Sequence, residues 1–193
     1  MSANRTADRI AQVALSILEK EGPEAVSMRR VAQAVGITPM AIYHHFPSRE
    51  ALLNTITDRE FAKLLSHIEA HPLRGSIEDR LLAVMEGYVD YAFEQPRVFD
   101  FVFSRVRPGA RQFPKDFRAR KSPTLNPVAD MLAAEMEKGN LKKDDVWEVA
   151  FALWAHVHGY VVLYRGGRIS LPEKDFRNLL HRSLRRFLYG LKA

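Results

Sequence analysis

Three side chains that can donate hydrogen bonds to a polyanion follow one another near the start of the chain: Tyr43, His44 and His45. Phenol and imidazole groups suit phosphate oxygens as acceptors. A few residues earlier stand Pro39 and Met40, whose apolar side chains suit contact with the methyl group of thymine. The combination predicts a surface that touches both the backbone and the base edges of double-stranded DNA.

A short helix must position these side chains. Thr38 is a typical N-cap residue, and Pro39 is favoured at the first helical position. Ser48 is the expected cap of the next helix, so the helix between them runs from Pro39 to about His45. A helix of about two turns is not stable alone. We therefore expect neighbouring helices to prop it and present it to a partner.

The preceding helix completes a helix-turn-helix, in which the second helix enters the DNA major groove. Ser27 is the expected N-cap of the first helix of this motif, and Gly36 ends it. The free N–H groups after Ser27 could face phosphates. Arg29 can reach either a phosphate or the O6 and N7 atoms of a guanine, and Arg49 is predicted to clamp a phosphate.

The whole chain is predicted to be all-α, with about nine helices, because apolar residues recur at helical spacing between Gly and Pro breaks. We expect a helix-turn-helix DNA-binding domain at residues 1–48, a connecting helix at 49–70, and a second helical domain at 71–193. The helices expected after the connecting helix span residues 77–94, 97–104, 124–138, 143–165 and 173–190.

Charge is uneven along the chain, whose net charge is +6 and whose pI is about 9.7. Residues 97–121 hold eight Lys or Arg against two Asp, so the remainder sums to zero. The basic segment 105–121 has three possible interpretations: a solvated mobile loop, a segment that steers the protein to DNA, or an attractor for an anionic effector. The sequence favours the first.

The composition bounds the compartment. The chain has no Cys, which excludes disulfides and thiolate metal sites and fits a cytoplasmic protein. Its polar start predicts no signal peptide. The apolar stretch 146–164 approaches membrane-spanning length, but it contains Glu148, His156 and His158, which favour a buried core helix over a membrane span.

No set of residues for catalysis or for a cofactor is recognised. There is no Gly-rich phosphate loop, and His67 and His71 are spaced for one metal without an obvious third ligand. The sequence therefore predicts no enzyme, no cofactor and no metal site.

The string SMRRVAQAVGITPMAIYHHFPSREALL, residues 27–53, closely resembles the DNA-binding motif of the TetR family of transcriptional regulators. The resemblance covers about residues 5–58. Many members carry Lys, Ser or Gly where this chain has Pro39 and Met40, a departure that favours a site containing thymine. The family's usual DNA-contacting positions correspond here to Ser27, Arg29, Thr38, Met40, Tyr43, His44, His45 and Arg49.

A second string, LWAHVHGYVVLY at residues 153–164, resembles the WHG type of TetR C-terminal domain. That type is named for a Trp, a His and a Gly, which correspond here to Trp154, His158 and Gly159. The resemblance implies that residues 71–193 form an effector-binding and dimerisation domain. It implies a homodimer through the helices near 143–165 and 173–190, and a small-molecule effector of unknown identity. Pockets between bundle helices are usual ligand sites, although plain core packing explains most aromatic residues there. The expected effector-lining residues are Tyr91, Phe99, Phe151, Trp154 and His158.

Together these features predict a ligand-responsive repressor that binds a palindromic operator as a dimer and is released by its effector. An all-α enzyme or small-molecule binding protein that retains the helix-turn-helix as scaffold is the alternative. An architectural DNA binder is less favoured, because residues 1–58 hold six basic and six acidic residues rather than a basic excess.

Overall fold

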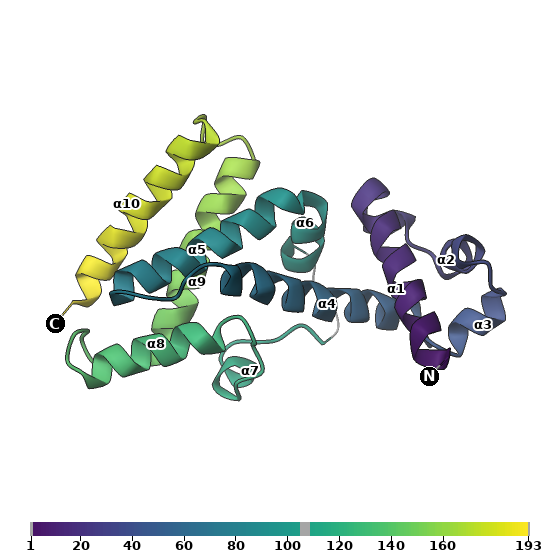
Figure 1. The fold of residues 1–193 in the computed structure, drawn as a ribbon, viewed down its shortest axis with the longest axis horizontal. Helices are drawn as coiled ribbons and strands as arrows, with labels where there is room; N and C mark the ends of the chain where they lie inside the picture. Colours follow the sequence, from purple (N-terminus) through teal and green to yellow (C-terminus); the bar gives the residue numbers. More distant parts are fainter. Residues whose placement is uncertain (1, 105–108, 193) are drawn as a thin grey trace. The chain divides into compact units, whose positions relative to one another are not determined.

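The computed structural model describes residues 2–104 and 109–192, whose regular structure is helical apart from one isolated bridge between Leu141 and Lys192. The predicted all-α fold is confirmed, and each of the nine expected helices is found. The helices are α1 (Ser2–Glu21), α2 (Met28–Val35), α3 (Pro39–Tyr43), α4 (Arg49–Ala70), α5 (Ile77–Glu94), α6 (Pro96–Ser104), α7 (Lys115–Arg118), α8 (Asn126–Glu137), α9 (Val146–Arg165) and α10 (Glu173–Leu191), with a 3₁₀ turn, η1, at Pro23–Ala25 (Figure 1).

Two differences from the prediction concern short helices. Helix α3 ends at Tyr43 instead of His45. Helix α7 lies inside the segment that was expected to be a loop, and its four residues are too few to produce a helical period in the sequence. Residues 105–108 of that segment lie outside the described residues.

The chain divides into two compact units. The first comprises the described residues of 1–63 and 93–110, and the second those of 64–92 and 111–193, so α4 and α5 each contribute to both. Helix α6 belongs to the first unit, because Val98, Phe101 and Val102 join its buried core. The unit defined by packing is therefore larger than the predicted domain 1–48, whose boundary stays a prediction about function.

Local hydrogen bonds begin the three helices of the helix-turn-helix region where the sequence predicts. The hydroxyl oxygens of the N-cap residues accept from backbone N–H groups three residues on: Ser27 from Arg30 at 3.3 Å, Thr38 from Ala41 at 3.2 Å, and Ser48 from Ala51 at 3.1 Å. Gly36 ends α2 at a φ of 79°, a left-handed conformation that favours glycine. These caps fix where α3 starts.

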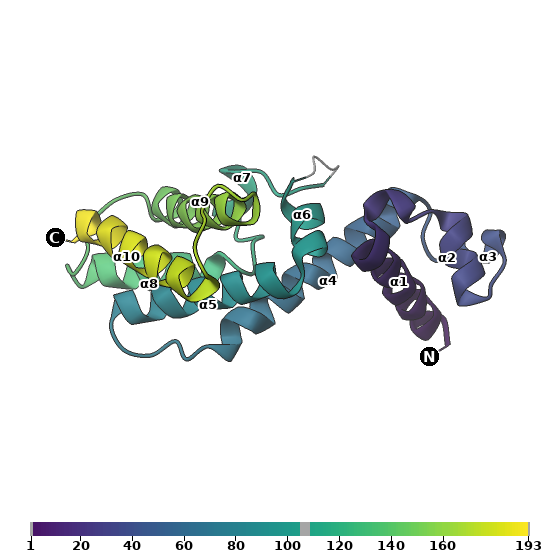
Figure 2. The same cartoon turned by 90° about the horizontal axis from the view of Figure 1, so that it is seen from above.

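The second unit contains α8, α9 and α10, with α9 packed against both of the others (Figure 2). Within this unit α5 approaches the end of α4 closely at Gly87, where a Cβ atom would lie 2.6 Å from the Cα of Ile68. Only a residue without a side chain allows two backbones to come so near.

Helix α9 differs from the predicted buried core helix. It is long and apolar enough to cross a membrane by length and composition, which is weak evidence by itself, yet only 28% of that window is buried. One face packs inward through Leu153, Val157 and Val161, whereas Val162 and Leu163 are exposed. The helix is therefore buried along one face and exposes apolar side chains near its end.

Candidate nucleic-acid interface and aromatic cluster

Helix α3 is held by one face and exposes the rest. Ile42 is fully buried in the core of the first unit, and Phe46, just after the helix, is buried beside it. In contrast, 70% of Met40 and 49% of Tyr43 are exposed, and Pro39 and His44 are also exposed. The face of α3 that carries Met40 and Tyr43 is therefore accessible to a partner.

The residues flanking α3 fall into two groups. Thr38, Ser27 and Arg29 are exposed, and among the described residues no ion-pair partner is assigned to Arg29. Its neighbour Arg30 instead pairs with Glu21. Exposed cations without an internal partner keep their charge available to a polyanion.

His45 and Arg49 are only half-buried, and Arg49 differs from the other predicted contact residues. Its Nε donates to the carbonyl oxygen of Val26 at 2.7 Å, and one terminal nitrogen donates to that of Pro23 at 2.6 Å. The predicted phosphate clamp thus has its guanidinium engaged within the first unit. The remaining predicted contact residues lie on α3 or at the caps and first turns beside it.

The predicted effector residues do not all meet. Phe151, Trp154 and His158 line one side of α9 in the second unit. The Phe151 and Trp154 rings lie edge to face with centroids 5.3 Å apart, and the Trp154 and His158 rings are tilted with centroids 5.9 Å apart. Tyr91 is buried edge-on against His67. Phe99 packs on Phe103 within the first unit. Three of the five therefore form one cluster.

Sequence reasoning did not include three aromatic residues that complete this cluster. The ring of Phe113 lies 4.5 Å from that of Phe151, and Phe117 of α7 stacks on Trp154 at 6.4 Å. Both precede α8 in the segment predicted to be a loop, so no helical period signalled them. The third is Tyr88 of α5, whose hydroxyl lies 2.8 Å from Nδ1 of His158.

A hydrogen-bonded relay runs through the cluster. The indole Nε1 of Trp154 can only donate, and it donates to the Tyr88 hydroxyl at 3.3 Å. We assign the tyrosine proton to the contact with Nδ1 of His158, which makes Nδ1 the acceptor and leaves the proton of the neutral ring on Nε2. Burial lowers the pKa of His158 and raises that of Tyr88, so both groups are held neutral.

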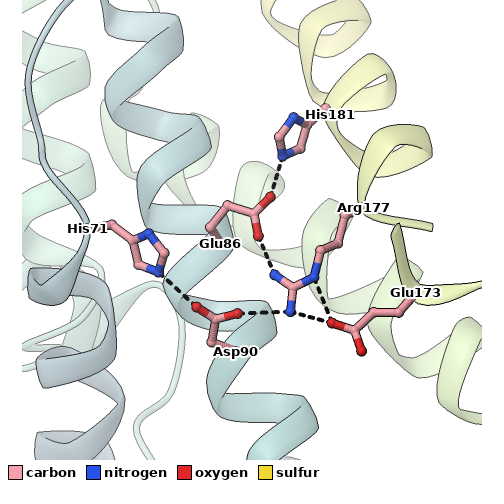
Figure 3. Close-up of polar contacts among 6 residues, drawn as sticks. All are labelled: His71, Glu86, Asp90, Glu173, Arg177 and His181. Carbon is pink, nitrogen blue, oxygen red and sulfur yellow. Dashed lines mark hydrogen bonds and ion pairs between the residues drawn. The ribbon is translucent and has the colours of Figure 1, made fainter. Parts of the chain in front are cut away.

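A second polar group in this unit centres on Arg177 of α10 (Figure 3). Its guanidinium contacts Glu86 and Asp90 of α5 and Glu173 of α10, the last two at 2.8 and 2.9 Å. His181 adds a contact to Glu86. His71, at the end of α4, lies 2.8 Å from Asp90. The network ties three segments together.

Three cations at the end of the basic segment pair with carboxylates. Arg118 pairs with Asp145 at 2.6 Å, and Arg120 makes a two-pronged contact with Asp130 at 2.8 and 2.9 Å. Lys121 lies 2.9 Å from Asp116. In the described part of the chain, no group of three or more His, Cys, Asp or Glu residues is arranged to hold a metal ion.

Helices α2 and α3 form a helix-turn-helix whose second helix is short and exposes one face. This arrangement is typical of helix-turn-helix DNA-binding regulators. Residues 10–56 match the family model for bacterial regulatory proteins of the tetR family, and residues 81–187 match that for the tetracyclin repressor-like C-terminal domain. The chain belongs to the TetR family of transcriptional regulators. The predictions of family and of a DNA-binding regulator are confirmed, and the family is one of regulators, not of enzymes.

One relative matches nearly the whole chain and another matches less than half of it. The helix-turn-helix-type transcriptional regulator YobS of Bacillus subtilis is 22% identical over 96% of this chain and 92% of its own length. The transcriptional repressor KstR of Mycolicibacterium smegmatis is 32% identical over 45% of this chain and 43% of its own length. Among solved structures, the flavonoid-responsive regulator FrrA shares the fold with a TM-score of 0.70, 24% identity and 98% coverage of both chains.

Proposed function

We propose that this protein is a cytoplasmic repressor that binds a palindromic operator as a homodimer and leaves it when a small molecule binds. The observation that carries the proposal is the exposed face of α3, where Met40 and Tyr43 project from a helix anchored by Ile42. A helix presented in this way fits the major groove of B-DNA.

The proposed contacts follow from the chemistry of each side chain. Pro39 and Met40, at the leading end of α3, meet thymine methyl groups. Tyr43, at the end of α3, and His44 and His45, which follow it, donate to phosphate oxygens. The remaining proposed contacts, at the caps and first turns, are made by Ser27, Arg29 and Thr38.

The proposed dimer forms through α9 and α10. Support comes from the apolar surface of α9, where 48% of Leu163 is exposed beside Val162, and from Tyr189 of α10, 79% exposed. A second copy that covers this surface removes it from water, which is the main favourable term in association. Two copies then place their α3 helices about one DNA turn apart.

The proposed effector site is the aromatic cluster of the second unit, around Phe151, Trp154 and His158. Aromatic faces with one or two polar groups are usual features of small-molecule sites. KstR is named a repressor and FrrA a flavonoid-responsive regulator, which supports the same class of behaviour here. An effector can release DNA only if it binds the DNA-competent and the incompetent conformations unequally.

The first experiment is selection of binding sites from a random duplex library at about 0.15 M salt. The expected result is a palindrome with half-sites about one helical turn apart and thymine at the positions read by Met40. Met40→Ala should relax the preference for thymine, whereas Gln33→Ala, an exposed change on α2, should not.

Failure to enrich any site, also after denaturation and refolding to remove bound ligand, would contradict the proposal. That result would favour a binding protein that keeps the helix-turn-helix as scaffold. Equal affinity for selected and random duplexes would instead indicate an architectural DNA binder.

A further inference from the structure

Arg49 opens α4, three residues after Phe46, and its side chain turns back toward the connection between α1 and α2. It donates to the carbonyl oxygens of Pro23 and Val26, which lie at the two ends of η1 and its cap. Glu24, between them, lies 3.8 Å from the same guanidinium. Only 31% of the Arg49 side chain is exposed.

Three other arginines of the first unit show what is unusual about this arrangement. Arg30 and Arg59 pair with the carboxylates of Glu21 and Asp8. Arg97 donates to main-chain carbonyl oxygens at the end of α1. Arg49 alone among these four contacts the main chain of the connection that leads into the helix-turn-helix. The contacts of Arg49 therefore lie within the DNA-binding part of the first unit, directly before α2.

The place of the two carbonyl groups in the chain determines which helices the contact restrains. Val26 immediately precedes Ser27, the N-cap of α2, so the guanidinium joins the start of α2 to the start of α4. Helix α3 lies between these two points in the chain. A charged donor that bridges two carbonyl oxygens makes shorter and stronger hydrogen bonds than a neutral one. The bridge thus restrains both ends of the segment that carries the recognition helix.

We propose that Arg49 is a positioning residue that sets the recognition helix for its operator, rather than a phosphate clamp. The inference rests on the proposed DNA-binding function and concerns the same interface. Its restraint acts through Pro23 and Val26 on the placement of α2 and α3. Phosphate attraction falls to cations such as Arg29.

The two roles make opposite demands on the side chain at position 49. A phosphate clamp needs a positive charge, which Lys also supplies. A bridge between two carbonyl oxygens needs the planar fork of a guanidinium, whose Nε and terminal nitrogens donate in fixed directions. Lys carries a single ammonium group and cannot reproduce both contacts in that geometry. Arg49→Lys therefore separates the two roles.

The test measures the affinity of Arg49→Lys, Arg49→Gln and wild type for the selected operator and for random duplex, across a series of salt concentrations. Both variants should lose about tenfold or more in operator affinity, and they should bind random duplex as wild type does. The slope of log affinity against log salt should stay unchanged, because no phosphate contact is removed. Arg29→Gln is the matched control and should reduce the slope by about 0.9.

Circular dichroism at the assay temperature establishes that each variant is folded. A purely structural role would lower the unfolding temperature and leave the ratio of operator to random affinity unchanged, which would overturn the proposal. So would wild-type affinity in Arg49→Lys together with a slope reduced by about 0.9 in Arg49→Gln. If wild type itself selects no operator, the proposed function fails, and this inference falls with it.

Discussion

The hydroxyl group of Tyr88 offers the most direct test of the aromatic cluster. Tyr88 is 6% exposed, accepts a hydrogen bond from Trp154 Nε1 at 3.3 Å, and donates one to His158 Nδ1 at 2.8 Å. Tyr88→Phe removes one oxygen atom and leaves the ring in place. Both polar atoms that met the hydroxyl then lose this partner inside the second unit.

The expected cost follows from these two hydrogen bonds. A net hydrogen bond contributes about 0.5–1.5 kcal/mol, and a buried polar group left without its partner costs about 1–3 kcal/mol. The longer contact to Trp154 lies at the weak end of this range. We expect Tyr88→Phe to lower the free energy of unfolding by about 2 kcal/mol, or the midpoint of thermal unfolding by about 4–8 °C in a chain of this size.

Urea unfolding followed by tryptophan fluorescence is the appropriate assay. The chain has two tryptophans, Trp147 and Trp154, and both lie in α9, so the signal reports on the second unit. Tyr43→Phe is the matched control, because Tyr43 is 49% exposed and lies outside the proposed dimer interface. The control should change the free energy of unfolding by less than about 0.5 kcal/mol.

A loss below about 0.5 kcal/mol in Tyr88→Phe would refute the reasoning. It would mean that solvent or another group satisfies Trp154 and His158 as well as the hydroxyl does. An equal loss in Tyr43→Phe would show that the effect does not come from the relay.

Three further outcomes test other contacts in the second unit. Gly87→Ala should lower the free energy of unfolding by about 1–3 kcal/mol, because the added Cβ would meet backbone atoms of α4. In the control Gly190→Ala the Cβ meets nothing within 4 Å, so the change should stay within about 0.5 kcal/mol. Equal thermal midpoints of the two variants would contradict this prediction. Arg177→Met removes the cation that three carboxylates share and should lower the free energy of unfolding in urea by about 2 kcal/mol. The control Arg182→Met changes an exposed arginine of the same helix and should have little effect. Similar losses in the two variants would refute the role of the network. Burial lowers the pKa of His158 below its ordinary 6.5, so as pH falls the unfolded chain takes up the proton first and the free energy of unfolding should decrease below about pH 6.5. His158→Gln should flatten this dependence in unfolding midpoints measured from about pH 7 to 5. An unchanged pH dependence in the variant would count against this reasoning.

The fold could be predicted well because its signals are local. Ser27, Thr38 and Ser48 each accept a hydrogen bond from a group three residues away, so a short stretch of sequence contains both partners. The exposed face of α3 was predictable for the same reason, since Ile42 and Phe46 mark its buried side.

The candidate sites were less predictable where partners lie far apart in the chain. Arg49 was expected to face phosphate, but its acceptors are 23 and 26 residues away. Phe99 was grouped with Trp154 as an aromatic residue, yet it packs in the first unit. Residue type indicates what a side chain can do, but not which surface it meets.

Interactions within one or two helical turns made much of this fold predictable from the sequence: the helices other than α7, the caps of the helix-turn-helix region and the face that α3 exposes. Only the tertiary structure decided that Phe113 and Phe117 join the cluster on α9 and that Arg177 gathers carboxylates from two helices. The physical reason is that such contacts require segments many residues apart to pack together. The direction of each side chain is then set by burial of the whole core, which no local pattern contains.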